Sequence, residues 1–293
     1  MRVLVTGGAG FVGTNLIKRL LKDGHEVISV DNYSTGYYKN QQRGCEYYQR
    51  DLSDSCWWSL TNTDMCEVTC DCQIEPVDVI YHLAALARIQ PSFDDPTKSF
   101  KSNLLEWARR YNTPVVYAGT SSAHGDIFAN PYTFTKCQGE EIVTMYNKLF
   151  NLPTAICRFY NVYGPHQITE GAYCCVLGIF ERQFYKGNPL TITGDGEQRR
   201  DFTHVEDIVD GMVKCGENID KASGEIFELG NGNNYSINEI ANAFGDYPKK
   251  YIDAKPGEMR ETLNIDTKAQ DVLNWKPKND IIKYIRENYE VQK

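Results

Sequence analysis

Three glycines spaced three residues apart, Gly7, Gly10 and Gly13, follow a short apolar segment and precede a helical pattern. In a strand–turn–helix unit the first glycine permits the tight turn, the second lets a diphosphate approach the backbone, and the third allows close packing. The helix N-terminus also stabilises negative charge. An ordinary turn can have the same spacing, but the flanking strand and helix match what the mechanism requires. The segment therefore predicts a dinucleotide-binding turn that also includes Phe11 and Val12.

A carboxylate, Asp31, ends the second apolar segment of the chain. At that position a carboxylate accepts hydrogen bonds from an adenosine ribose and repels the 2′-phosphate of NADP. The cofactor predicted from this charge is NAD. Asp31 and Asn32 are also good turn residues, so a simple turn is the alternative.

Tyr132 and Lys136 are four residues apart, and such positions share one face of a helix. A lysine ammonium near a phenol stabilises the phenolate, which lets the tyrosine act as a general acid–base. Exposed helices often carry the same pair by chance. The hydroxyls of Thr120, Ser121 and Ser122 end the preceding strand, at the sheet edge where ligands bind. A hydroxyl there is placed to orient a substrate and the tyrosine, although a serine-rich turn has the same composition.

Alternating strand and helix patterns surround these residues. Strands are predicted over Arg2–Thr6, Glu26–Val30, Asp78–His82, Pro114–Gly119 and Pro153–Phe159, and helices over Phe11–Leu21, Thr97–Tyr111 and Tyr132–Phe150. This order predicts an α/β fold, a Rossmann-type doubly wound parallel sheet with helices on both faces. After residue 165 the rhythm weakens. We expect an NAD-binding domain over 1–165 and a smaller mixed α/β substrate-binding region over 166–293, with segments that return to the first domain.

Composition narrows the class of protein further. The net charge of −8 argues against a nucleic-acid partner, and no stretch approaches the ~20 apolar residues of a membrane span. Without a signal-peptide pattern we expect a cytoplasmic protein whose ten cysteines are reduced thiols. Cys66, Cys70 and Cys72 lack the paired spacing of common zinc sites, so no metal is predicted.

Together these motifs resemble the extended short-chain dehydrogenase/reductase family. Within it they are most similar to the NAD-dependent nucleotide-sugar epimerases and dehydratases, above all the UDP-hexose 4-epimerases. Further matching segments follow in family order and cover nearly the whole chain: Asp51–Leu52, His82–Ala85, Arg158–Pro165, Gly194–Phe202 and Lys255–Glu258.

The resemblance implies a role for each matching residue. Tyr132 is then the acid–base, Lys136 also holds the nicotinamide ribose, and Thr120 completes the catalytic set. The remaining cofactor residues are Asn32, then Asp51 and Leu52 beside the adenine, and Leu83, Ala84 and Ala85 close to the cofactor. The residues implied to bind the nucleotide sugar are Ser121, Ser122, Asn161, Leu190, Ile192, Arg200, Lys255 and Thr262.

The branches of the family carry different residues at the positions that are Ser121, Ser122 and Ala123 in this chain. Dehydratases carry an acidic pair where this chain has Ser121 and Ser122, and 3,5-epimerases use a cysteine where it has Ala123. The resemblance therefore implies 4-epimerisation through a transient 4-keto sugar. A 4,6-dehydratase or decarboxylase, or a non-catalytic NAD-binding regulator, are the alternatives. Thr262 leaves room for UDP-glucose, UDP-GlcNAc or UDP-glucuronate.

Some parts of the chain depart from the family pattern. The helix between Asn103 and Val115 is shorter than usual, and it normally contributes to the family's dimer interface, so homodimer formation is left open. Lys255 stands where arginine is usual, so the planar guanidinium of an arginine is replaced by the single charge of an ammonium group.

Overall fold

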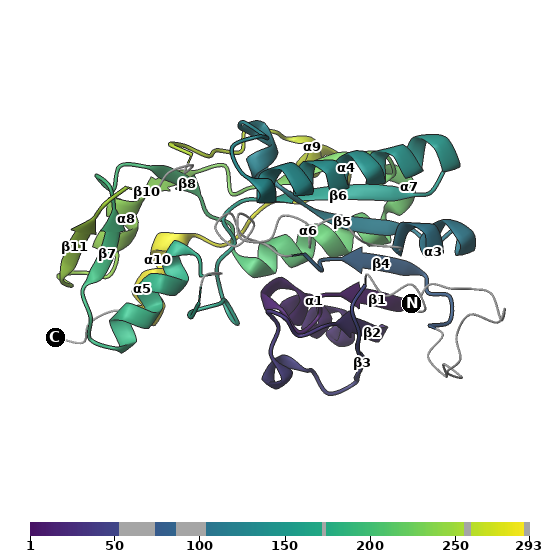
Figure 1. Cartoon of the computed structure of the whole chain (residues 1–293), viewed down its shortest axis with the longest axis horizontal. Coiled ribbons are helices and arrows are strands. Elements are labelled where there is room, and N and C mark those ends of the chain that lie inside the picture. The colour runs from purple at the N-terminus through teal and green to yellow at the C-terminus, as the bar shows by residue number, and fades with distance from the viewer. Residues whose placement is uncertain (53–73, 86–103, 172–173, 255–258, 290–293) are drawn as a thin grey trace.

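The computed structural model describes residues 1–52, 74–85, 104–171, 174–254 and 259–289 (Figure 1). Its main feature is a seven-stranded sheet in the order β3-β2-β1-β4-β5-β6-β9, with every neighbouring pair parallel. The strands are β1 (Arg2–Thr6), β2 (Glu26–Asp31), β3 (Cys45–Gln49), β4 (Val79–His82), β5 (Val115–Thr120), β6 (Thr154–Phe159) and β9 (Ile226–Leu229). The strand order reverses between β1 and β4, and ligands bind at the carboxyl ends of strands beside such a reversal.

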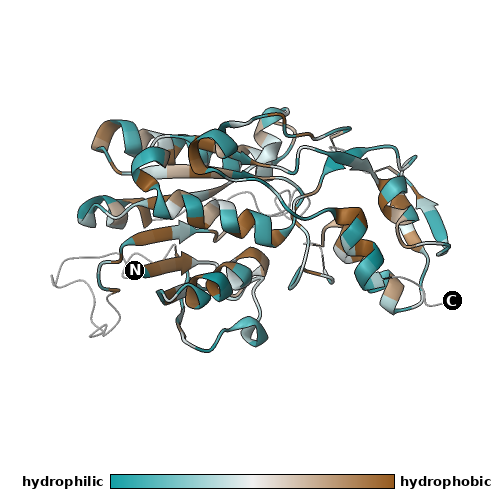
Figure 2. Cartoon of the chain, turned by 180° about the vertical axis from the view of Figure 1, so that it is seen from behind, coloured by the Kyte–Doolittle hydropathy of each residue, from teal (hydrophilic) through white to brown (hydrophobic). Residues whose placement is uncertain are grey.

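Helices cover both faces of the sheet. On one face lie α1 (Phe11–Lys22), α6 (Val205–Glu217), α7 (Ile219–Ala222) and α9 (Lys268–Leu273), and on the other α3 (Leu104–Tyr111) and α4 (Pro131–Phe150). Neighbouring side chains of a strand point to opposite faces, so Val3 and Val5 pack under α1 and α6 while Leu4 packs toward α3. Figure 2 shows hydrophobic residues along these central strands and on the helices that cover them. The predicted Rossmann-type sheet with helices on both faces is confirmed.

The helix that carries Tyr132 and Lys136 has well-defined ends. Before α4, the side chain of Asn130 accepts a hydrogen bond from the Thr133 amide, and Pro131 occupies the first turn. At its other end Asn151 adopts a left-handed conformation, with φ of 54°. A capped start and a sharp stop hold this long helix in register against β5 and β6.

A smaller region follows β6 and lies at the left of Figure 1. It contains two two-stranded sheets, β7 (Leu190–Thr193) with β11 (Lys249–Ile252) and β8 (Arg199–Asp201) with β10 (Asn234–Ser236). Its helices are α5 (Val176–Tyr185), α8 (Ile237–Asn242) and α10 (Ile281–Tyr289). It has an apolar core of its own around Phe180 and Phe244. The chain crosses between the regions, because α6 and β9 return to the large sheet.

Most predicted elements lie within a residue or two of those observed. The helix predicted over 97–111 is seen as α3 in its described part, and residues 97–103 lie outside the described ranges. β3 was not predicted, and neither were the short 3-10 helices η1 (Tyr38–Asn40) and η4 (Ser121–His124).

In the part of the chain that the structure describes, no helix is long and apolar enough to cross a membrane. The same residues contain no group of three metal-ligating side chains. The cysteine cluster at 66–72 falls outside them.

Candidate active site

The glycine turn connects β1 to α1 and lies against the loop after β4. Gly7 has a φ of 73°, and a Cβ there would be 3.0 Å from the Ala84 Cα. A Cβ on Gly13 would be only 2.2 Å from the Gly7 carbonyl oxygen. The first amides of α1 have no acceptor within the helix, as in any helix, and Gly10 before them provides no side-chain cap. These amides fit the diphosphate of a dinucleotide.

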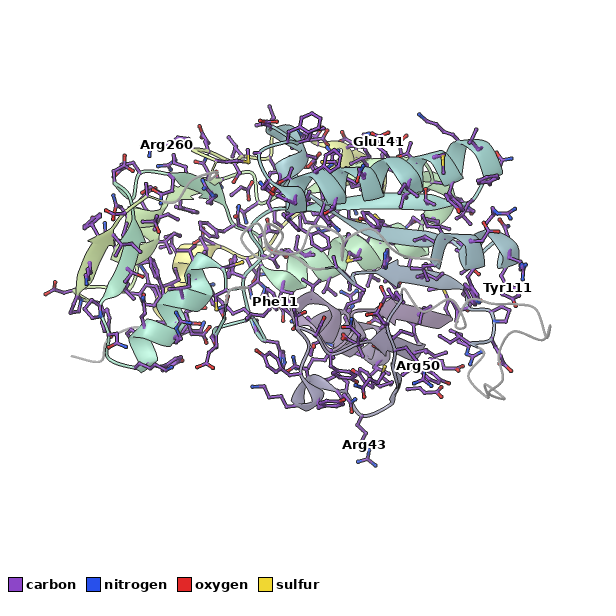
Figure 3. The ribbon with its side chains drawn as sticks, viewed as in Figure 1. Phe11, Arg43, Arg50, Tyr111, Glu141 and Arg260 are labelled. Atoms are coloured by element: carbon purple, nitrogen blue, oxygen red, sulfur yellow. The ribbon has the colours of Figure 1, made fainter. Side chains whose placement is uncertain are left out.

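Figure 3 shows Phe11 at the start of α1, which faces the C-terminal region. The loop after β6 is tied to this helix, because the Asn15 amide donates to the Pro165 carbonyl at 2.8 Å. Phe11 and Val12 are partly buried and pack against the core beneath the sheet. The predicted cofactor turn therefore lies next to the segment where the second region begins.

Asp31 ends β2 beside the turn. Its side chain is 8% exposed and accepts hydrogen bonds from the amides of Ala9 (2.9 Å) and Tyr33 (2.7 Å). Burial raises the pKa of the Asp31 carboxyl, and the two amides oppose that rise. Asn32 donates to a carboxylate oxygen of Asp51 at 2.9 Å, so these two predicted residues lie together. The site has the carboxylate that an adenosine ribose requires.

The loop after β4 is held in place by Thr6. The Thr6 hydroxyl oxygen accepts hydrogen bonds from the amides of Leu83 and Ala84, at 3.2 Å each, and lies 2.7 Å from His82 Nδ1. Since both amides donate to it, the hydroxyl donates its own proton to Nδ1. Burial, and then Lys136, lower the pKa of His82 to about 3. Leu83 and Ala84 are thereby fixed against Gly7, and Ala85 is exposed next to them.

The predicted catalytic residues come from β5 and α4, which pack against each other. The buried Lys136 ammonium donates to the Ala118 carbonyl and, at 3.3 Å, to the Tyr117 hydroxyl. Burial lowers the pKa of Lys136, while Tyr132 and Glu140 oppose that change. Lys136 is thus within electrostatic range of Tyr132, which is half-buried one turn earlier.

Thr120 is the last residue of β5 and is 5% exposed. Its hydroxyl oxygen accepts a hydrogen bond from the Ser122 amide at 3.2 Å and so caps η4. Ser121 is buried in η4 and Ser122 is partly exposed. The three hydroxyl residues therefore form one tight turn at the carboxyl edge of the sheet, as expected.

Two residues expected to bind a nucleotide sugar are in contact. The Asn161 side-chain amide donates to the Thr262 hydroxyl at 3.2 Å and to the Asp201 carbonyl at 2.8 Å. Arg200 precedes Asp201 in β8, and one of its guanidinium nitrogens donates to the Arg199 carbonyl. Asn161, Thr262 and Arg200 thus lie in one neighbourhood after β6. Lys255 lies outside the described residues.

The side chains of Leu190 and Ile192 are both 0% exposed and belong to the core of the C-terminal region. Thr191 between them is partly exposed. The side chains of Leu190 and Ile192 therefore do not line a binding surface in this structure, contrary to the expectation that they face a nucleotide base.

Sequence reasoning missed two features of this site. A Cβ on Gly8 would be 2.1 Å from the Ser29 hydroxyl, so this glycine is required for packing under the turn. Glu140 is buried one turn after Lys136 and accepts a hydrogen bond from the Thr120 amide at 3.1 Å. Its spacing from Tyr132 and Lys136 along one helix face was the available signal.

Known proteins share this fold and this sequence pattern. The sequence profile of the NAD dependent epimerase/dehydratase family matches residues 3–230. A UDP-glucose 4-epimerase of Mycolicibacterium smegmatis is 33% identical over 94% of this chain and 94% of its own length. UDP-glucuronic acid decarboxylase 1 of Arabidopsis thaliana is 29% identical over 95% of this chain and 66% of its own.

A solved structure shows the same arrangement. The UDP-glucuronic acid 4-epimerase of Bacillus cereus, in complex with UDP-glucuronic acid and NAD, superposes with a TM-score of 0.84 at 26% identity. The comparison covers 99% of this chain and 98% of that one.

Fold and site together define an extended short-chain dehydrogenase/reductase. The chain belongs to the NAD dependent epimerase/dehydratase family. It is an NAD-dependent enzyme of the epimerase type, and the predictions of family, enzyme class and cofactor are confirmed.

Proposed function

We propose that the chain interconverts the C4 epimers of a nucleotide sugar, a UDP-hexose such as UDP-glucose, UDP-GlcNAc or UDP-glucuronate. The observation that carries the proposal is the packing of α4 on β5. In that packing the Lys136 ammonium donates to the Ala118 carbonyl, two residues before β5 ends at Thr120, and Tyr132 lies one turn earlier on the same helix. A regulator that only bound NAD would have no use for this set of proton-transfer groups.

The chain's own residues would bind, orient and move one proton. The amides at the start of α1 and the Asp31 carboxylate would hold the cofactor's diphosphate and ribose. Bound NAD supplies a reversible hydride acceptor for C4 of the sugar. Tyr132 would take the 4-hydroxyl proton as C4 is oxidised and return it after the 4-keto sugar has turned over. Lys136 would stabilise the tyrosine anion, and the Thr120 hydroxyl would orient the sugar oxygen.

The substrate would bind across both regions. We assign residues 1–165 chiefly to NAD and residues 166–293 chiefly to the nucleotide sugar. Arg200 is suited to a diphosphate oxygen, because its planar fork binds oxyanions bidentately. Asn161 and Thr262, in contact with each other, would border the sugar, and a threonine there leaves room for a substituent at C2.

Decarboxylation of UDP-glucuronate is the second candidate. It is supported by the similarity to the Arabidopsis decarboxylase over 95% of this chain. Both reactions begin with the same oxidation at C4, so the catalytic residues alone do not separate them. The product does, because decarboxylation yields a pentose and carbon dioxide while epimerisation conserves every carbon.

A turnover assay tests the proposal. The holoenzyme is incubated with each of the three UDP-sugars without added reductant, and products are separated by chromatography. We expect the 4-epimer of at least one sugar, and loss of turnover in Tyr132→Phe. Tyr146→Phe, on the same helix with its hydroxyl 3.5 Å from Glu106, is the matched control. Turnover that survives Tyr132→Phe, or a pentose as the only product, contradicts the proposal.

The proposal extends to a homodimer through α4. Ile142, Met145 and Leu149 are 45%, 41% and 68% exposed and are spaced three and four residues apart. That spacing places them in one apolar stripe on the solvent side of the helix. We expect a dimer in light scattering and a monomer for Leu149→Glu, and a monomeric wild type would overturn the assignment.

A further inference from the structure

A buried carboxylate lies behind the residue proposed to orient the substrate. Glu140 is 3% exposed, and its Oε1 accepts the Thr120 amide at 3.1 Å. Its Oε2 accepts two hydrogen bonds from the Arg158 guanidinium, at 2.9 and 2.7 Å. Glu140 thus ties the end of β5 to β6 from within α4.

The same guanidinium reaches a second carboxylate. Arg158 also donates to Glu228 Oε1 at 3.0 Å, and Glu228 lies in β9 with 7% exposure. That oxygen is 2.9 Å from the His124 ring, and the other oxygen accepts the Tyr160 hydroxyl at 3.0 Å. Glu140, Arg158 and Glu228, which we call the clamp, therefore hold the turn from Thr120 to His124 at both of its ends.

We infer that Glu140 is a positioning residue for catalysis, which acts by fixing the Thr120 backbone so that the Thr120 hydroxyl faces the reacting oxygen. The inference rests on the proposed function. Thr120 is the last residue of β5 paired with β6, opposite Phe159, and its amide donates to Glu140 Oε1 at the point where the chain leaves the strand. A displacement of about 1 Å at a reacting group can cost ~100-fold in rate.

Glutamate is specifically suited to this position. The clamp needs two acceptor oxygens on the side chain at 140, one toward Thr120 and one toward Arg158. A glutamine has one acceptor oxygen, and its NH₂ group would oppose either the amide of Thr120 or the guanidinium. Glu140→Gln therefore releases one of the two contacts while conserving the shape of the side chain.

Two measurements on the full-length holoenzyme test the inference. The first is hydrogen–deuterium exchange of the segment 119–125. The second is a double-mutant cycle on kcat that combines Glu140→Gln with Thr120→Ala. Glu141→Gln is the matched control, because Glu141 is the next residue on α4 and is exposed (Figure 3). Because breaking a buried ion pair can prevent folding, His124→Ala provides a second variant, at the half-exposed histidine that the clamp holds through Glu228.

We expect Glu140→Gln to speed exchange in segment 119–125 and to lower kcat about tenfold or more, with KM within about twofold. When Thr120 is already alanine, Glu140→Gln should lower kcat little further, because the hydroxyl through which Glu140 acts has been removed. His124→Ala should speed exchange in the same segment. Glu141→Gln should match the wild type in both measurements.

Unchanged exchange in Glu140→Gln overturns the inference, and if that variant does not fold, unchanged exchange in His124→Ala overturns it instead. If the two substitutions lower kcat independently, so that the double variant shows the product of the single effects, Glu140 acts by another route and the inference is overturned. If the wild type turns over no nucleotide sugar, the proposed function has failed, while the exchange measurement still decides whether the clamp positions Thr120.

Discussion

Alanine substitutions at Gly10 and Gly13 separate cofactor binding from folding within a single turn. A Cβ on Gly10 would be 3.2 Å from the Gly7 carbonyl oxygen, and Gly10 has an ordinary φ of −80°. The turn accommodates that contact with a small shift, and we expect Gly10→Ala to cost less than about 1 kcal/mol in stability. The new methyl would occupy the surface that the diphosphate approaches. We therefore expect the Kd for NAD to rise about tenfold or more, or about 1.4 kcal/mol.

Gly13→Ala should behave in the opposite way. Its Cβ would be 2.2 Å from the Gly7 carbonyl oxygen and 2.7 Å from the Gly8 Cα, so helix and turn must separate. A forced separation of about 1 Å in a packed core costs about 1–3 kcal/mol. Thermal unfolding without NAD and titration with NAD give the two quantities for each variant. If Gly10→Ala binds NAD as the wild type does, the diphosphate is not at this turn and the reasoning is refuted.

Three further predictions concern charged groups of the site. The pKa of His82 is about 3 in the fold, against about 6.5 in the unfolded chain. Between these two pH values the unfolded chain carries a proton on His82 that the folded chain does not. The free energy of unfolding should therefore fall by about 1.4 kcal/mol for each pH unit as the pH decreases through that range. His82→Asn should remove this dependence in denaturant titrations, and an identical slope in the variant would contradict it. Burial lowers the pKa of Lys136, so this lysine loses its charge at a pH below the pKa of an ordinary lysine. Because the charge stabilises the Tyr132 anion, kcat should decline with rising pH at that lower value. Lys136→Arg should shift that decline upward because a guanidinium stays charged, and an unmoved alkaline limb would assign it to another group. Asp31→Asn should raise the Kd for NAD and lower that for NADP, since the repulsion of the 2′-phosphate disappears. Equal effects on both cofactors would rule out that role.

The central strands were predictable because they are buried on both faces. β1 contains the apolar run Val3–Val5 and β2 contains Val27, Ile28 and Val30, and such apolar strands are typical of a buried parallel sheet. β3 lies at the edge of the sheet and is partly exposed over Cys45–Gln49, so its residues carry no apolar run. Its strand conformation comes from pairing with β2, which a local pattern does not report.

The site was predictable where its residues are close together in the sequence, and it was not predictable where they are far apart in the sequence. The glycine turn and the pair on α4 each lie within a few neighbouring residues. The clamp joins Arg158 to Glu228, 70 residues later, and only the pairing of β6 with β9 brings them together. Leu190 and Ile192 were expected to face a nucleotide base, but alternation along β7 directs both side chains into the core.

A substrate deuterated at C4 tests the central claim most directly. If the chain epimerises through a 4-keto sugar and returns the same hydride, the 4-epimer formed in ordinary water should retain its deuterium at C4. The label is followed by mass spectrometry and proton NMR of the nucleotide sugar. Loss of the deuterium to solvent during formation of the epimer would contradict the account.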